Sequence, residues 1–502
     1  MLWCRKYNVV TKISYENAQS LEFPAVTICN HNKIHCGKLY QAIRNCETDN
    51  SCSDGKFDKL CSLFLLGACG VSVNISELFT HGQITKPEVC KESDAMALSN
   101  TTRKKNIYDF YRNKFLDVYS TLSEEDVHEI SHDSKEMIAS CSFESHEYQD
   151  EHCQRLMKGI QKFFSPKHGT CYSFNFAGPE VVPGTEWHHF RPRNTSFNGP
   201  FYGLRLEINL GSNFYLRNGL TQNEGLAVVI HPPRMVPLVS NSAINVKPNT
   251  ATSIELGFKS VHRQSNPYPS NCSDTWKLSS YSDIHDDEIS YQTNLCLSKC
   301  TSDLIQKTCQ CKSIQLDEYH DEHSLEEASS NMTYCDISDR LDNKCIAGVV
   351  NSIGNETSCK CPLRCNEISY PTQVSSSRWP SKLYWGYLAY QHKIIYHGQL
   401  VEPVTIRDAI MTGGEGMEAM EEIREYINEN FLLLEVHFKS MTLERIEEVR
   451  KYDFFSFLAS LGGSLSLYLG ISIVAAFEVF ELLLRLPYGC YKRSRKIESN
   501  SK

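Results

Sequence analysis

The sequence LGGSLSLYLGISIVAAFEVFELLL (Leu461–Leu484) decides how the chain is organised, because it predicts a helix inside a membrane. The 24 residues from Phe454 to Phe477 carry no charge, and about 20 apolar residues are enough to cross a bilayer as a helix. Glu478 and Glu481 follow at the end of this run. Carboxylates at membrane depth are costly and usually face a bundle interior or a water-filled path. The segment is therefore typical of a helix that lines a pore.

One face of this helix, predicted over residues 453–484, combines small, hydroxyl and acidic side chains. Spacing of three or four residues collects Ser456, Ser460, Gly463, Ser464, Leu467, Gly470, Ile471, Val474, Glu478 and Glu481 on that face. Small residues at this spacing are also typical of helices that pack against one another in membranes. Helix packing accounts for the glycines but not for two carboxylates one turn apart, so the pattern favours a pore.

Charge predicts which side of the membrane each part of the chain occupies. Six basic residues and one glutamate follow Leu484, whereas the whole chain of 502 residues has a net charge of −9. Basic residues directly after a membrane helix mark the cytoplasmic side, so we expect the long preceding region to be extracellular. The first ten residues are too short to span a membrane and contain Arg5 and Lys6. We therefore expect a first transmembrane helix that is largely missing from this sequence.

Cysteines and glycosylation sequons support an extracellular location. Of 22 cysteines, 20 lie between Cys29 and Cys365, as a disulfide framework requires. The pairs Cys309/Cys311 and Cys359/Cys361 could suggest metal ligands, but their spacing is not that of zinc sites, and we expect disulfides and no metal. Asn-x-Ser/Thr sequons in the same region are candidate glycosylation sites. They lie at Asn74, Asn100, Asn194, Asn271, Asn331 and Asn355.

Other clusters of polar residues have simpler explanations. The histidines, among them His128 and His132, could sense protons, and the acidic run Asp286–Glu288 could bind calcium. Exposed polar residues on charged loops explain both patterns more simply. No nucleophile elbow, metalloprotease motif or phosphate-binding loop is present. We therefore expect no enzyme activity, no cofactor and no nucleic-acid partner.

Local patterns predict several elements before the membrane segment. Alternation and β-branched residues predict strands in Phe23–Cys29, in much of Gly169–Ser265 and in Phe431–Phe438. Ser123, followed by acids, is suited to begin a helix. The aromatic-rich segment Trp379–Lys393 predicts another helix, and the Gly- and Glu-rich segment Thr412–Glu425 predicts a mobile loop.

The motifs taken together resemble the degenerin/epithelial sodium channel family, which includes the acid-sensing and peptide-gated channels. The resemblance extends in order over nearly the whole chain. It is carried by FPAVTICN (Phe23–Asn30), CSF from Cys141, GTCYSFN (Gly169–Asn175), YQTNLCLSKC (Tyr291–Cys300), CPLRCNEISYP (Cys361–Pro371) and the membrane segment itself. Asn8 and Val9 replace two histidines of acid-sensing members, and Ser460 replaces an aspartate.

The resemblance implies an α+β membrane protein with a large disulfide-rich extracellular region. Its parts are 1–10, the end of a first transmembrane helix and a linker; 11–30, a palm strand; 31–165, the finger; 166–271, palm and β-ball; 272–365, the thumb; 366–452, palm and knuckle; 453–484, the pore-lining helix; and 485–502, a cytoplasmic tail. The disulfide cysteines implied are Cys141, Cys171, Cys272, Cys296, Cys300, Cys309, Cys311, Cys335, Cys345, Cys359, Cys361 and Cys365.

The resemblance also implies a function and the residues that perform it. It implies a subunit of a homo- or hetero-trimeric, amiloride-sensitive sodium channel of the plasma membrane, multi-pass when complete, gated by an extracellular peptide or by protons. Gly470, Ile471 and Ser472 would form the selectivity filter. Ser460, Gly463, Ser464, Leu467, Glu478 and Glu481 would line the pore. Ala459 occupies the degenerin position, which controls gating, and Tyr268, where the family has tryptophan, would couple to Tyr7.

A second class of protein fits the residues without the resemblance. A single-span, disulfide-rich receptor or adhesion protein would have the same extracellular region but would not conduct ions. The two interpretations differ in the last helix, because only a channel requires a particular face of it.

Overall fold

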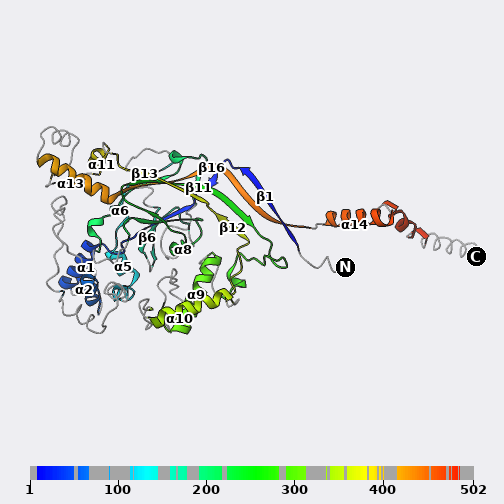
Figure 1. Cartoon of the computed structure of the whole chain (residues 1–502), viewed down its shortest axis with the longest axis horizontal. Helices are drawn as coiled ribbons and strands as arrows, with labels where there is room; N and C mark the ends of the chain where they lie inside the picture. Colours follow the sequence, from blue (N-terminus) through cyan, green and yellow to red (C-terminus); the bar gives the residue numbers. More distant parts are fainter. Residues whose placement is uncertain are drawn as a thin grey trace, which may run out of the picture. The chain divides into compact units, whose positions relative to one another are not determined.

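The chain, shown as a computed structural model in Figure 1, comprises two compact units. One comprises residues 1–13, 263–271 and 446–502, and the other residues 14–262 and 272–445. The structure describes residues 8–49, 52, 55–66, 90, 114–116, 118–144, 159–165, 168–177, 192–216, 223–281, 290–312, 335, 340–355, 359–381, 384–392, 395–396, 399–400, 415–451, 454–470, 474–475, 477–483 and 485–486.

A seven-stranded sheet is built around one long strand, β16 (Phe431–Arg450). The order is β12-β11-β16-β8-β4, with β1 paired to β16 and β13 paired to β11. The other strands are β1 (Val9–Asn17), β4 (Ile138–Phe143), β8 (Leu204–Asn209), β11 (Thr250–His262), β12 (Asn366–Ser369) and β13 (Thr372–Arg378). The strand predicted at Phe431–Phe438 is confirmed, and it runs 12 residues further than expected, to Arg450.

A five-stranded sheet has the order β10-β9-β3-β6-β5. Its strands are β3 (Ala25–Asn30), β5 (Gln161–Ser165), β6 (Gly169–Phe174), β9 (Leu226–His231) and β10 (Ile244–Val246). The prediction of a strand in Phe23–Cys29 is confirmed, with Pro24 directly before it. Short pairs complete the strands: β2 (Leu21–Glu22) with β7 (Asn194–Thr195), and β14 (Ile395–Tyr396) with β15 (Gln399–Leu400).

The main core lies between the two sheets, and the first part of β16, residues 431–438, is buried on both of its faces. Alternate residues Leu432 and Leu434 join the core shared with β3 and β8. Phe431 and Leu433 point to the other face, where they pack with α11 (Trp385–Gln391) and α13 (Glu415–Asn430). A strand buried on both faces loses the polar–apolar alternation of an exposed sheet, which explains the continuous run FLLLEV.

Helices form two further clusters. α1 (Cys36–Asp49), α2 (Lys56–Leu66) and α5 (Glu124–Ile130) share one apolar core. Ser123 caps α5 as predicted, because its side chain accepts a hydrogen bond from the amide of Asp126 at 3.2 Å. α9 (Thr293–Cys309) packs beside α10 (Arg340–Asn355), and a second core forms around Trp276. Short helices are α6 (Ser134–Met137), α8 (Val239–Ser242), η4 (Pro200–Tyr202), η5 (Ser212–Phe214) and η6 (Trp276–Leu278).

Two predictions from local sequence are wrong. The helix expected to begin at Trp379 begins at Trp385, because β13 continues to Arg378 and Trp379 packs into the cluster of α11 and α13. The segment Thr412–Glu425 was expected to be a mobile loop, but α13 begins at Glu415. Ile423 and Ile427, one turn apart in α13, are buried against β16. Tertiary packing therefore outweighs the Gly- and Glu-rich composition.

Candidate functional site

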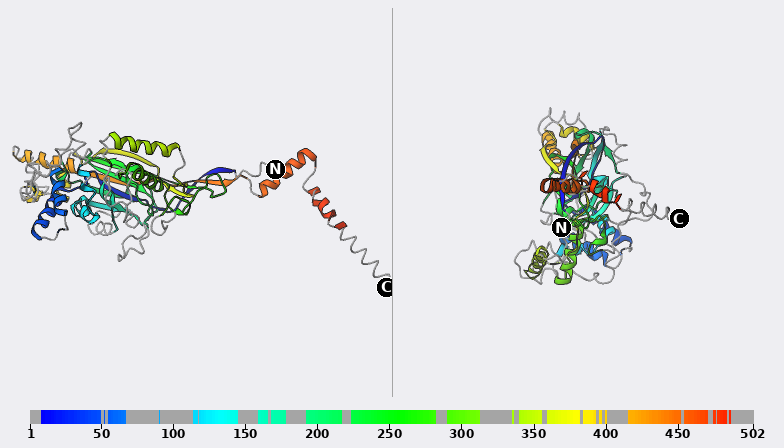
Figure 2. Two further views of the ribbon diagram at one scale, coloured as in Figure 1. Left: turned by 90° about the horizontal axis from the view of Figure 1, so that it is seen from below. Right: turned by 90° about the vertical axis from the view of Figure 1, so that its right-hand side faces the viewer.

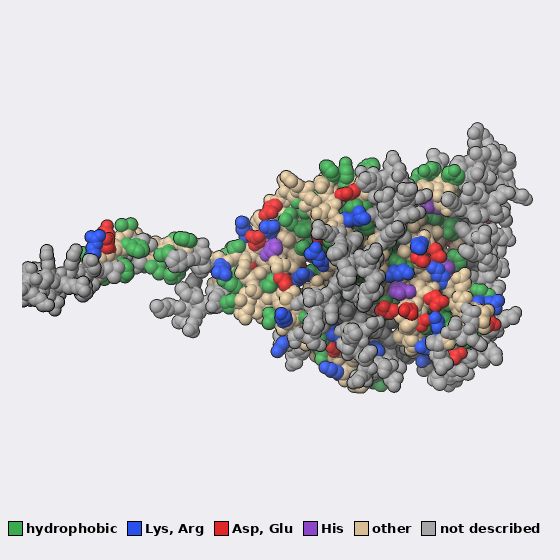
Figure 3. Space-filling view, turned by 180° about the vertical axis from the view of Figure 1, so that it is seen from behind, with side chains coloured by type: hydrophobic (Ala, Val, Ile, Leu, Met, Phe, Trp, Pro, Cys, Tyr) green, Lys and Arg blue, Asp and Glu red, His purple; other side chains and the backbone are tan. Residues whose placement is uncertain are grey.

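Helix α14 (Phe454–Leu469) exposes apolar side chains around its whole circumference. Phe455, Leu467 and Tyr468 are 78%, 80% and 83% exposed, and at helical spacing they point in different directions. Figure 3 shows hydrophobic side chains on the surface of this part of the chain. A helix that is apolar on all sides requires apolar surroundings. The described part of the chain does not provide these surroundings for α14.

The structure corrects the prediction of one helix over residues 453–484. α14 ends at Leu469, and helical residues occur again at 474–475 and 477–483 (Figure 2). Within the described residues, no single helix is both long enough and apolar enough to cross a membrane.

Gly470 explains where α14 stops. Its amide still donates a helical hydrogen bond to the carbonyl of Ser466 at 3.1 Å, but its φ is +64°. This left-handed conformation suits glycine, which has no Cβ, and it ends the helix. A Cβ added at Gly470 or at Gly463 would meet no atom within 4 Å. Backbone conformation, not space within the chain, thus requires glycine at position 470. Ile471 and Ser472 lie outside the described residues.

The predicted pore-lining residues are divided between two helical segments. Ser460, Gly463, Ser464 and Leu467 are exposed on α14, as is Ala459 at the predicted gating position. Glu478 and Glu481 are exposed on the segment after the interruption, where the carboxylate of Glu481 pairs with Arg485. The prediction of one continuous face assumed an unbroken helix. Because the helix is interrupted, the two groups of residues do not form one face of a single helix.

The structure gives Tyr268 a partner that sequence reasoning missed. The guanidinium of Arg450 lies 5.7 Å from the centre of the Tyr268 ring, a distance at which a cation and an aromatic face attract. Arg450 is the last residue of β16, four positions before α14 begins. Tyr7, the predicted partner, lies outside the described residues. The sequence did contain a signal for this contact, namely a basic residue at the end of the strand that leads into the helix.

The cysteines form a ladder of disulfides beside α9. Cys296 pairs with Cys361 and Cys300 pairs with Cys359. Four residues along a helix rise about 6 Å, and two residues of extended chain cover about 6.6 Å, so the two spacings match. The remaining rungs are Cys309–Cys345, Cys311–Cys335 and Cys272–Cys365. Further disulfides are Cys29–Cys171, Cys46–Cys52 and Cys61–Cys90, and Cys36 and Cys141 are also disulfide-bonded.

The other polar candidates differ in burial. Asn194 and Asn271 are exposed, whereas Asn74, Asn100 and Asn331 lie outside the described residues, as does the acidic run 286–288. Asn355 is the last residue of α10. His132 was expected to be exposed but is only 7% exposed, and burial holds its pKa well below the usual value. The described residues contain no cluster of three or more His, Cys, Asp or Glu that could hold a metal ion.

Comparisons with known proteins agree over most of the chain. The sequence model of a family described as "Amiloride-sensitive sodium channel" matches residues 2–482. The chain is 23% identical to degenerin unc-8 of Caenorhabditis elegans over 81% of its own length and 47% of that protein. It is 24% identical to human acid-sensing ion channel 2 over 96% of its length and 76% of that protein.

The human epithelial sodium channel subunit beta is 22% identical, over 76% of this chain and 53% of that protein. The chain spans less than half the length of the first curated relatives it matches, which are degenerins and a degenerin-like protein.

Proposed function

The chain belongs to the amiloride-sensitive sodium channel family, a family of ion channels and not of enzymes, and on that premise we propose that it is a subunit of a sodium-selective cation channel. The channel is trimeric, either homo- or hetero-oligomeric, and is blocked by amiloride. It opens in response to an extracellular stimulus, either a peptide or protons. Residues 11–452 form its extracellular finger, thumb, palm, knuckle and β-ball, and the channel lies in the plasma membrane.

The observation that carries this proposal is the combination found at α14. The helix is uncharged, exposes apolar side chains on all sides and ends at a glycine with φ +64°. That glycine occupies the family's Gly-x-Ser position, Gly470–Ser472. A lipid bilayer supplies the apolar surroundings, and irregular backbone within a membrane is tolerable where it lines water.

The proposed mechanism follows from the interruption of the helix. Three copies of Gly470–Ser472 bring backbone carbonyls around the axis, where they replace part of the hydration shell of Na⁺. Ser460, Gly463, Ser464 and Leu467 line the path outside this constriction, and Glu478 and Glu481 attract cations on its inner side. Because Glu481 also pairs with Arg485, Glu478 carries more of that attraction.

The first experiment is voltage clamp on oocytes that express the full-length protein with the substitution Ala459→Phe. Bulk at the degenerin position holds the pore open and so replaces the unknown stimulus. We expect a standing Na⁺ current that amiloride blocks. Leu458→Phe is the matched control, because it adds a large side chain one residue earlier, about 100° around the helix, and should give no standing current. Surface protein without current in Ala459→Phe would instead favour a non-conducting receptor.

A further inference from the structure

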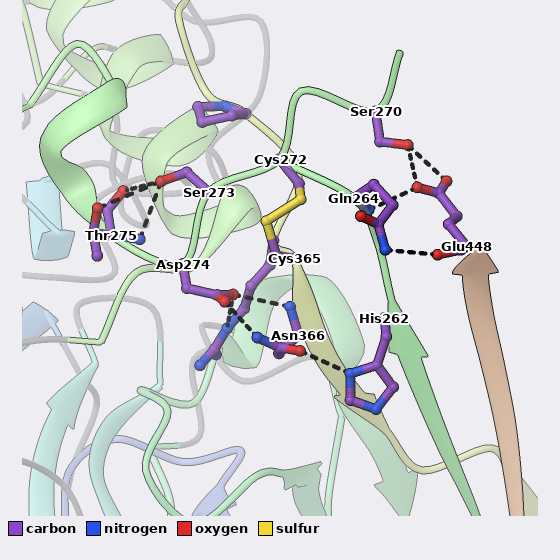
Figure 4. The surroundings of a disulfide bond; sticks show 12 residues. His262, Gln264, Ser270, Cys272, Ser273, Asp274, Thr275, Cys365, Asn366 and Glu448 are labelled. Atoms are coloured by element: carbon purple, nitrogen blue, oxygen red, sulfur yellow. Dashed lines mark hydrogen bonds and ion pairs between the residues drawn. A yellow bond between two sulfur atoms is a disulfide. The ribbon is translucent and has the colours of Figure 1, made fainter. Parts of the chain in front are cut away.

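The carboxylate of Glu448 gathers hydrogen bonds from the loop that joins β11 to Cys272. The Ser270 hydroxyl donates to both carboxylate oxygens, at 2.6 Å and 2.5 Å, and the Gln264 amide N–H donates to Oε2 at 2.9 Å. The Gln264 side-chain amide also donates to the backbone carbonyl of Glu448 at 2.8 Å. Figure 4 shows both loop residues converging on this one glutamate. Hydrogen bonds to a charged acceptor are among the stronger ones in proteins.

The loop closes on itself between these two contacts. The amide of Tyr268 donates to the carbonyl of Ser265, and the amide of Asn271 donates to the carbonyl of Tyr268. Together with Arg450 against the Tyr268 ring, three side chains of the loop contact two of the last three residues of β16, Glu448 and Arg450. Gln264, Ser270 and Glu448 are all partly buried, so water competes less strongly for their hydrogen bonds than at an open surface.

The residues that flank the loop are held by two consecutive residues at the start of β12. Before the loop, His262 Nδ1 lies 2.7 Å from Asn366 Oδ1. After the loop, Cys272 forms a disulfide with Cys365. Asp274 accepts hydrogen bonds from the backbone and side-chain amides of Asn366, at 2.9 Å and 2.6 Å (Figure 4). The chain therefore enters and leaves the loop next to one disulfide.

We propose that Glu448 is a positioning residue for gating, through which the loop 263–271 sets the position of α14. β16 ends two residues after Glu448 and α14 begins at Phe454, so there is little chain to absorb a displacement. Moving the loop moves the strand end, and with it the start of the helix. This inference rests on the proposed channel function, but the contact of Glu448 with the loop does not.

The test compares Glu448→Ala and Glu448→Gln with Glu444→Ala, which removes a carboxylate from the same strand. Hydrogen exchange on the purified full-length protein in nanodiscs measures the contact without any current. We expect Glu448→Ala to raise exchange at the Gln264 amide at least about tenfold, because that amide loses a charged acceptor. Glu448→Gln keeps a neutral acceptor oxygen, so its effect should be smaller, and Glu444→Ala should change nothing.

Voltage clamp then distinguishes a role of Glu448 in gating from a role in folding. We expect Glu448→Ala to change the unstimulated, amiloride-blocked current per surface channel at least about threefold, which corresponds to a small shift of the gating equilibrium. The same substitution in the Ala459→Phe channel should leave the standing current unchanged, because that pore is already held open.

Four results would overturn the inference. Unchanged exchange at Gln264 in Glu448→Ala would mean that the contact does not hold the loop. Raised exchange with an unchanged current in the otherwise unaltered channel would mean that the contact has no role in gating. If Glu448→Ala lowered the current and the surface protein equally, both with and without Ala459→Phe, Glu448 would have a role in folding only. Absence of current from the Ala459→Phe channel itself would count against the proposed function, and the gating role would fall with it.

Discussion

At the scale of single residues, function and stability depend on positions where the backbone or the burial is unusual. Gly470 adopts a left-handed conformation in open space, and His231 is a buried imidazole at the end of β9, opposite Ala25 of β3. The backbone freedom of glycine gives one prediction, and the burial of a titratable ring gives another.

Replacing Gly470 should impair the pore through the backbone. An L-residue with a Cβ at φ +64° costs about 1 to 2 kcal/mol, and asparagine tolerates this region better than alanine or leucine. We therefore expect Gly470→Leu to abolish the current or its sodium selectivity while the protein still reaches the cell surface. Gly470→Asn should retain more current than Gly470→Ala. Equal currents in these two variants would show that left-handed backbone is not what position 470 requires.

Burial of His231 should make the folded protein sensitive to acid. Desolvation lowers its pKa to about 4, while its Nε2 lies 2.8 Å from the Thr27 hydroxyl. An unfolded chain, with a histidine pKa near about 6.5, binds the proton more readily, so this stability is complete above that pH. It is lost as the pH falls to 4, by about 3 kcal/mol.

Denaturant titrations at several pH values measure this loss. His231→Gln, which does not titrate, should show a shallower dependence of stability on pH than the unaltered protein. The same pH slope in both proteins would assign the acid sensitivity to other groups.

At the scale of elements, the disulfide ladder stabilises α9 cooperatively. Cys296–Cys361 and Cys300–Cys359 are adjacent rungs, which close sequence separations of 65 and 59 residues. With one rung intact, the other closes only a small additional loop. Loop entropy therefore predicts about 2.5 kcal/mol for the loss of either rung, and the loss of both should cost more than the sum of the two.

This non-additivity can be measured by unfolding the two single-rung variants and the double variant. In each, both cysteines of a rung are replaced by alanine, so that no free thiol remains. Fluorescence of the buried Trp276, which packs with Leu295 and Cys296, reports on this region. Strictly additive losses would contradict the loop-entropy account.

At the scale of the whole molecule, the apolar surface of α14 is not covered by the residues that the structure describes. Its apolar side chains are exposed, and a Cβ at Gly463 would meet nothing within 4 Å, so no close neighbour in the described part of the chain requires this residue to be small. Small residues in membrane helices commonly allow close approach of another helix. This supports the proposal that α14 packs against copies of itself or of related subunits.

The assembled protein should therefore have three times the mass of one full-length subunit. Mass photometry of the detergent-solubilised, enzymatically deglycosylated full-length protein should give three times the mass of that subunit, plus bound detergent. The glycosylated sample should be heavier, since Asn194 and Asn271 are exposed. Gly463→Leu should weaken the assembly, whereas Phe455→Leu, which replaces one exposed apolar side chain by another, should not. A monomer under conditions that preserve the fold would contradict the proposed trimer.

The sequence by itself determined features that depend on local chemistry. The strand-like run FPAVTIC located β3, the hydroxyl of Ser123 located the start of α5, and ordered motifs identified the family. Cysteine number and compartment pointed to disulfides, because an oxidising environment pairs thiols whatever the fold. Each of these features of the sequence depends either on a few neighbouring residues or on the composition of the chain.

Only the tertiary structure decided features that depend on distant segments. Cysteine pairing required α9 to lie beside the extended segment Cys359–Cys361, and the helix α13 required β16 as a surface to bury Ile423 and Ile427. The hydrogen bonds from Ser270 to Glu448 join residues 178 positions apart. A sequence pattern records what each residue favours locally, but energies of packing and of hydrogen bonding arise only when the chain brings such residues together.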